Sequence, residues 1–202
     1  MHRKIMIIGR SGSGKDTVAQ ALTKLYGLKQ LCSSTTRPRR YEGEDTHIFV
    51  SEKEANMMTD RVAETVINGY QYFATRQQLE ECDTYVIDPI GLKCMQDNAK
   101  NVPLCVVYVN ASSAVRKDRA MKRASDPVEA ETIFYKRQAD EDGQFKEFEN
   151  QIYRLGFDEL KELFPTTELF ITIENNGSDK SAADGFAKKI MECVDETTIK
   201  HW

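Results

Sequence analysis

The sequence predicts an α/β fold in which helices cover both faces of a parallel β-sheet. Three observations favour this fold class: short apolar runs recur along the chain, helical patterns fill the intervals, and a glycine-rich loop follows the first run. Each apolar run is continuous rather than alternating, which is typical of strands that are buried on both faces. The alternation of strands and helices therefore indicates a doubly wound sheet with right-handed crossovers.

The elements of this sheet follow in order along the chain. We expect strands at residues 4–8, 84–88, 104–109 and 169–173, and helices at residues 15–26, 91–99, 112–123 and 178–194. Two segments break the alternation: residues 33–76 are polar with short strand-like pieces, and residues 125–157 are dense in charge and helical in pattern. We expect both to be insertions into one domain, whose core consists of residues 1–32, 77–124 and 158–202.

Length and composition exclude several classes of protein. The chain has 202 residues and a formal net charge of −4, which argues against a nucleic-acid partner because phosphate backbones require a basic surface. No stretch approaches about 18 apolar residues, and residues 5–8 are too short for a signal-peptide core, so we expect no membrane partner and a cytoplasmic location. The five cysteines are scattered without metal-ligand spacing, which indicates reduced thiols and argues against zinc. A monomer and a homodimer both remain open.

The first strand leads into a loop that is suited to binding phosphate. Residues 9–15 fit the pattern G-x-x-x-x-G-K, placed after an expected strand and before an expected helix. Glycines allow successive backbone N–H groups to point at phosphate oxygens, the helix adds its positive end, and Lys15 adds a mobile cation. The alternative is an ordinary glycine–serine turn. The candidate ATP-binding residues are Gly9, Arg10, Ser11, Gly12, Ser13, Gly14, Lys15, Asp16 and Thr17.

Asp16 departs from the usual pattern, which has a hydroxyl at this position. A carboxylate can ligate Mg²⁺ as a hard oxygen donor, and Thr17 offers a hydroxyl one residue later, so both are candidate metal ligands. The alternative is that Asp16 turns outward and caps the first turn of the helix. The sequence GKDT is also similar to the loop of some phage-type deoxynucleotide kinases, which favours a kinase over a switch GTPase.

A second candidate phosphate site lies in the segment SSTTRPRRYEGEDTHIFVSEKE at residues 33–54. Arg37, Arg39 and Arg40 lie beside hydroxyls, and Pro38 restricts the backbone, so the guanidinium groups can converge on one phosphate. A solvated charged face is the alternative. The two motifs together resemble the guanylate kinase family, which carries a GPSGSGKS/T loop followed by an S-x-T-T-R-x-x-R-x-G-E segment.

This resemblance implies a P-loop NTPase-type fold with an inserted site for a nucleoside monophosphate. It implies that Ser33 faces the guanine and that Arg37 and Arg40 hold the GMP phosphate. His47 stands where the family has a tyrosine, and Ile90 stands where the family has its second aspartate, which leaves the base specificity open. The remaining residues that the resemblance assigns to the monophosphate are Glu64 (one residue out of register), Tyr72, Thr75 and Asp88.

The charge-dense segment resembles the lid of the same family. Arg119 and Arg123 are four residues apart and share one helix face, and Arg137 follows on the next helix. In guanylate kinases a similar set of arginines closes over the transferring phosphate, so the resemblance implies a catalytic role for these three and for Lys15. A salt-bridged surface helix is the alternative, and Arg116 has no such counterpart.

The resemblance thus implies a kinase that transfers the γ-phosphoryl group of ATP to GMP or dGMP, with ATP and Mg²⁺ as cofactors and small nucleotides as partners. A kinase of another nucleoside monophosphate or of a small phosphorylated metabolite remains open. So does a non-catalytic guanylate-kinase-like binding module, although Gly14 and Lys15 are intact here. A switch GTPase is disfavoured because no convincing N-K-x-D motif is present.

Overall fold

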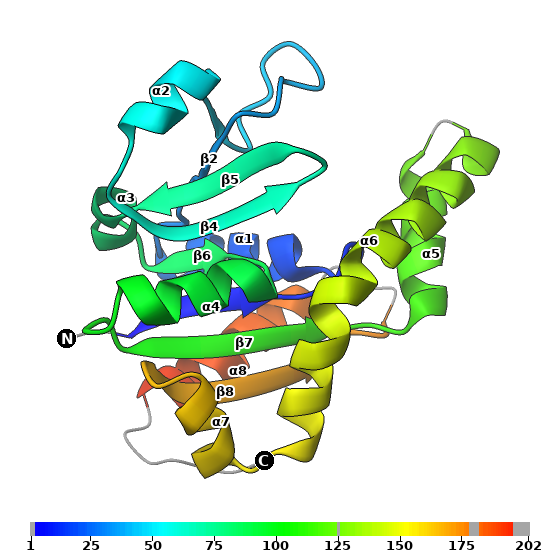
Figure 1. Cartoon of the computed structure of the whole chain (residues 1–202). Helices are drawn as coiled ribbons and strands as arrows, with labels where there is room; N and C mark the ends of the chain where they lie inside the picture. The colour runs from blue at the N-terminus through cyan, green and yellow to red at the C-terminus, as the bar shows by residue number, and fades with distance from the viewer. Residues whose placement is uncertain (1–2, 125, 178–181, 196–202) are drawn as a thin grey trace.

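The fold is a four-stranded parallel sheet with helices on both faces, as the sequence predicts (Figure 1). The computed structural model describes residues 3–124, 126–177 and 182–195; residue 125, part of the expected last helix (178–181) and residues 196–202 lie outside this description. The strands are ordered β6-β1-β7-β8, with β1 in the interior. They are β1 (Lys4–Ile8), β6 (Thr84–Val86), β7 (Leu104–Asn110) and β8 (Thr167–Glu174).

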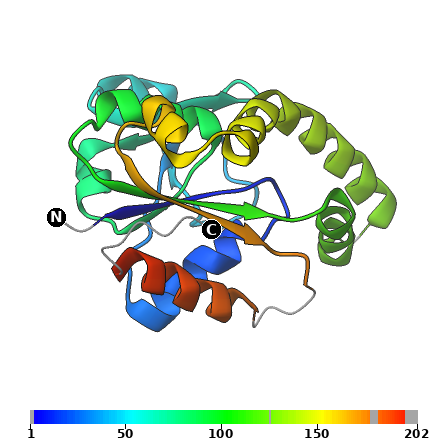
Figure 2. The same ribbon diagram turned by 90° about the horizontal axis from the view of Figure 1, so that it is seen from below.

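The helices divide between the two faces of this sheet, which is plain when the molecule is seen from below (Figure 2). The helices α1 and α8 cover one face, and α4, α7 and the second half of α6 cover the other. Their bounds are α1 (Lys15–Tyr26), α4 (Pro89–Asn98), α5 (Ser113–Arg123), α6 (Pro127–Arg154), α7 (Phe157–Leu163) and α8 (Ala182–Asp195). The short helix α7 was not predicted.

Residues 33–76 form a separate small sheet of order β3-β2-β5-β4 above the main one (Figure 1). Of its elements, the strands β2 and β4 and the helices α2 and α3 were not predicted. The elements are β2 (Ser34–Thr35), β3 (Ile48–Phe49), α2 (Glu52–Met57), β4 (Arg61–Ile67) and β5 (Tyr70–Thr75), with α3 (Arg76–Glu80) after them.

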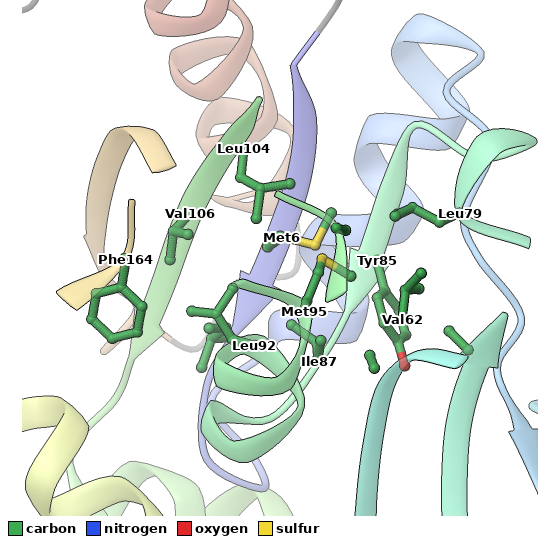
Figure 3. Packing of buried hydrophobic residues seen from close by; sticks show 14 of the residues in the cluster. Met6, Val62, Leu79, Tyr85, Ile87, Leu92, Met95, Leu104, Val106 and Phe164 are labelled. Atoms are coloured by element: carbon green, nitrogen blue, oxygen red, sulfur yellow. The ribbon is translucent and has the colours of Figure 1, made fainter. Parts of the chain in front are cut away.

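An apolar cluster fixes the inserted sheet to the core (Figure 3). Val62 of β4 and Leu79 of α3 pack with Tyr85 of β6 and with Ile87, the residue directly after β6. The same cluster continues to Met95 of α4, so one continuous apolar layer runs from the inserted sheet across the main sheet. Burial of this layer sets the position of the inserted sheet relative to the ends of the parallel strands.

The segment 125–157 is only partly a projecting lid. The helix α5 and the first half of α6 form a hairpin that extends from the sheet (Figures 1 and 2). Farther along α6, however, Phe145 and Phe148 are buried in the core with Phe164. None of the described helices is both long and apolar enough to span a bilayer, and the five cysteines are free thiols.

Candidate functional site

The phosphate loop follows β1 and is held in shape by residues from distant parts of the chain. Gly14 has a φ of 96°, and a Cβ there would lie 2.4 Å from the Nδ2 atom of Asn175. Asn175 in turn donates from Nδ2 to the carbonyl oxygen of Ser13 at 2.7 Å. Gly14 is therefore required both by its left-handed backbone and by the close approach of Asn175.

Lys15 and Asp16 begin α1 and lie side by side at the mouth of the loop. The Nζ atom of Lys15 lies 3.2 Å from a carboxylate oxygen of Asp16, whose side chain is 65% exposed. The cap position of α1 is Gly14, and no side chain caps the helix, so Asp16 does not have the capping role that was the alternative. Thr17 is half-buried on the same turn.

The described residues contain no cluster of three or more histidine, cysteine, aspartate or glutamate side chains that could hold a metal ion. A single exposed carboxylate nevertheless fits Mg²⁺ that arrives with nucleotide phosphates, because this ion keeps several waters and takes one or two protein carboxylates. Asp16 is the residue of the phosphate loop with this chemistry.

The side chain of Arg10 points away from the loop, contrary to its expected contact with ATP. Its guanidinium donates from Nε and one terminal nitrogen to Glu149, at 2.7 and 2.9 Å, and from the other to Asp142 at 2.7 Å. Burial alone lowers the pKa of Arg10, but these two carboxylates outweigh it and raise the pKa above its ordinary value. Arg10 thus ties the loop to α6 and leaves only its backbone for a phosphate.

One cleft of about 400 Å³ joins the phosphate loop to the inserted sheet. Its volume lies within the range of small-molecule sites, roughly 300–1,000 Å³. The phosphate loop, the inserted sheet, the start of α4 and the middle of α6 all line it. The polar residues that line it are Ser11, Lys15, Ser33, Arg37, Arg40, His47, Glu64, Thr65, Asn68, Tyr70, Tyr72, Tyr85, Asp88, Arg137, Asp140, Glu141 and Gln144.

Arg37 and Arg40 are organised by Glu44, which was not among the expected site residues. The Glu44 side chain is fully buried and accepts from both terminal nitrogens of Arg37, at 2.8 and 3.3 Å. It also accepts from the backbone N–H of Arg40 at 2.7 Å and from the hydroxyl of Thr46 at 3.0 Å. These bonds, that of Arg37 above all, lower the pKa of Glu44 to about 2. Glu44 ends the segment RPRRYEGE, one residue farther along than the acid of the family pattern R-x-x-R-x-G-E, and this Gly-Glu pair was the available signal.

Ser33, His47 and Tyr72 lie together at the back of the cleft. The Ser33 hydroxyl is 3.0 Å from Nδ1 of His47, and the His47 ring contacts the Tyr72 ring edge-on with centroids 5.4 Å apart. Burial, and then the charge of Arg37, lowers the pKa of His47, which keeps its imidazole neutral. The structure therefore brings together three expected acceptor residues: Ser33 and His47, which immediately precede β2 and β3, and Tyr72 of β5.

Thr65, rather than its neighbour Glu64, lies on the same face of the inserted sheet as Tyr72. The β4–β5 ladder contains an irregularity between Arg61 and Ala63 and pairs Thr65 with Tyr72. Because side chains alternate along a strand, Glu64 faces the opposite side from Tyr72. There its carboxylate accepts from Arg61 at 2.6 Å. We therefore revise the assignment of Glu64 to the acceptor. The ladder is regular from Ala63 to Ile67 and closes at Asn68-Gly69, so this two-residue turn was the local signal for the register that turns Thr65 inward.

Thr75 and Asp88 are both helix caps, with different consequences. Thr75 accepts from the backbone N–H of Gln78 and forms a capping box at the start of α3. It is not among the described residues that line the cleft, which corrects its expected contact with the acceptor; the pattern T-x-x-Q was the signal for this cap. Asp88 caps α4 by accepting from Gly91 at 2.9 Å, yet it also lines the cleft.

The three lid arginines occupy different places. Arg119 donates to the carbonyl oxygens of Gly12, Ser13, Asn175 and Gly177 at 2.7–3.0 Å. The Arg119 guanidinium thus stabilises the phosphate loop through these carbonyl groups. The expectation that it contacts the transferring phosphate is therefore corrected. Arg123 is exposed and bonds the carbonyl of Arg119 in its own helix. Of these three, Arg137 alone lines the cleft in the described structure.

Comparison with known proteins agrees with this architecture. The family model described as an AAA domain matches residues 5–145, well over half of the chain. No curated protein matches the sequence. Among solved structures, guanylate kinase from Anaplasma phagocytophilum is 18% identical over 97% of this chain and 88% of its own, with a TM-score of 0.52. This likeness concerns the fold.

Two further solved structures match nearly end to end but superpose less well. An uncharacterized protein from Eubacterium ventriosum is 15% identical over 96% of this chain and 99% of its own, with a TM-score of 0.45. A sugar kinase from Janibacter sp. HTCC2649 is 13% identical over the full length of both chains, with a TM-score of 0.44.

Proposed function

Since this chain belongs to the AAA domain family and has a kinase-like P-loop fold, we propose that it is a nucleoside monophosphate kinase. The reaction is transfer of the γ-phosphoryl group of ATP to GMP or dGMP, which yields ADP and GDP or dGDP. The single observation that carries this proposal is the cleft, because it exposes a phosphate loop with Lys15 to the same space as Arg37 and Arg40.

The two ends of the cleft have the chemistry of two phosphate sites. At one end, loop N–H groups and Lys15 hold the outer phosphates of ATP, and Lys15 neutralises charge on the phosphoryl group as it leaves. At the other end, Arg37 and Arg40 hold the acceptor phosphate, with Glu44 fixing the plane of Arg37. The fixed positions of these sites account for catalysis by proximity and charge neutralisation.

The acceptor needs little help from a general base. A phosphate monoester has its second pKa near about 6, so its attacking oxygen is already ionised at neutral pH. Mg²⁺ bound with ATP supplies charge neutralisation at the phosphates, and Asp16 is the oxygen ligand that this chain offers. Arg137 lines the cleft from α6, and its guanidinium would stabilise charge on the phosphoryl group in transit.

The experiment that tests this function measures turnover with a panel of acceptors. Purified protein is supplied with ATP and Mg²⁺ and with GMP, dGMP, AMP, CMP, UMP or dTMP, and ADP release is followed. We expect turnover with GMP and dGMP at the highest kcat/KM. Preference for another monophosphate would reassign the acceptor, and ATP binding without turnover of any member would indicate a binding module.

A further inference from the structure

Thr65 carries a buried hydroxyl at the border of the cleft. The residue is 6% exposed and lines the cleft, and its Oγ1 makes no hydrogen bond of normal geometry with any part of the described chain. Buried hydroxyl groups are almost always hydrogen-bonded, so an unpaired one that borders a cavity indicates a ligand group. The pairing of Thr65 with Tyr72 places this hydroxyl on the cleft side of the inserted sheet.

Asp88 faces the same part of the cleft from the main sheet. One of its carboxylate oxygens accepts from the backbone N–H of Gly91 at 2.9 Å, which fixes the carboxyl group. Burial raises the pKa of Asp88, and the N–H groups at the start of α4 and the nearby Thr65 hydroxyl oppose that rise. Thr65 and Asp88 thus present a donor and an acceptor side by side, from two separate sheets.

Glu64 is the competing candidate for reading the acceptor, and its contacts argue against it. Its carboxylate is bonded to Arg61, which also donates to Gln71 at 3.0 Å and lies over the Phe73 ring at 3.9 Å. Glu64 also lines the cleft, but these partners hold its side chain beside Phe73, on the face of β4 opposite Tyr72.

We infer that Thr65 and Asp88, rather than Glu64, read the base of the acceptor. The pair fits a ring edge in which an N–H donor lies next to a carbonyl oxygen: Asp88 accepts from the N–H and Thr65 donates to the carbonyl. In GMP these groups are N1–H and O6, and IMP presents the same edge. This inference rests on the proposed function and names the residues that give that site its specificity.

The test compares Thr65→Val, which keeps the shape but removes the hydroxyl, with Glu64→Gln at the adjacent position. Thr65→Val should raise KM for GMP and for IMP by the same factor, about tenfold, since one lost hydrogen bond is worth about that much. The kcat at saturation and the KM for ATP should stay within about twofold, and Thr65→Ser should restore most of the acceptor affinity. Glu64→Gln should leave all of these constants within about twofold.

A stability measurement separates recognition from a structural role. In the absence of nucleotide, Thr65→Val should change Tm little, because the hydroxyl that it removes makes no hydrogen bond of normal geometry in the described structure. A lower Tm with unchanged KM for GMP, or a raised KM in Glu64→Gln alone, would overturn the inference. If the unmodified protein turned over no monophosphate, the proposed function itself would fall, and this inference with it.

Discussion

Glu141 of α6 accepts a hydrogen bond of 2.9 Å from the backbone N–H of Ser11, inside the phosphate loop. Its other carboxylate oxygen is buried, bonds no described donor and lies 3.9 Å from the guanidinium of Arg116. The loop is proposed to bind ATP, and the Glu141 carboxylate already accepts a hydrogen bond from one of its N–H groups. The negative charge of Glu141 would repel a phosphate group that binds to this loop, and the carboxylate competes with that phosphate for the Ser11 N–H.

The first prediction concerns this competition. Glu141→Gln should lower the Kd for ATP by several-fold, because it removes charge repulsion worth on the order of 1 kcal/mol at a partly exposed site. Calorimetric titration with ATP measures the change. Asp140→Asn is the matched control, since Asp140 also lines the cleft and makes no bond to the loop. An equal gain in both variants would mean that net charge, rather than the contact with Ser11, controls the affinity.

The second prediction separates the two phosphate sites. Arg40→Ala should raise the KM for GMP by about tenfold or more, because a charge-assisted phosphate contact is worth roughly 1.5–3 kcal/mol. The KM for ATP should change little. Arg39→Ala is the control, because Arg39 lies over the Phe49 ring at 4.4 Å and does not line the cleft in the described structure. A loss of ATP affinity with GMP affinity intact would reverse the assignment of the sites.

The third prediction uses the buried carboxylate of Glu44. Its pKa is about 2 in the folded protein against an ordinary value of 4.5, so its contribution to stability is complete above about pH 4.5 and is lost as the pH falls toward 2. Glu44→Gln removes this contribution, so the difference in Tm between the two proteins should shrink over that interval. A pH titration of Tm measures it, and a difference that stays constant with pH would contradict the assigned pKa.

The inserted sheet shows why sequence patterns predicted some site residues and not others. The phosphate loop and the parallel strands were predicted correctly because their signals are local: glycine spacing and continuous apolar runs. The inward position of Thr65 depends on the register of the β4–β5 ladder, which the turn at Asn68-Gly69 sets. Glu64 and Thr65 are adjacent in sequence, so a shift of one residue exchanges the faces on which they lie.

The lid arginines show the same limit in a different way. Spacing placed Arg119 and Arg123 on one helix face, but it did not show which groups lie opposite that face. The carbonyl oxygens of Ser13 and Gly177 come from loops far apart in the chain, and they take up the Arg119 guanidinium. Glu44 was likewise missed: its Gly-Glu pair belongs to a recognised segment, but the sequence does not show that this carboxylate is buried against Arg37.

The fourth prediction concerns the departure from pattern at Asp16. Asp16→Asn should raise the Mg²⁺ concentration for half-maximal turnover by several-fold, because the amide keeps one oxygen but loses the charge that a hard cation prefers. Asp16→Ser should be milder, since it restores the usual hydroxyl. Because Asp16 caps no N–H group of α1, both variants should keep their Tm. An unchanged Mg²⁺ requirement would remove Asp16 from the metal site.

The central claim is that the phosphoryl group passes from the loop to a monophosphate across one cleft. Its most direct test is to incubate the protein with GMP, Mg²⁺ and ATP labelled at the γ-phosphate, and to separate the products by chromatography. We predict that the label appears in GDP, and that Lys15→Ala slows its appearance by about 100-fold or more without lowering Tm. Label found only in free phosphate, or GDP formed at an equal rate by Lys15→Ala, would contradict the account.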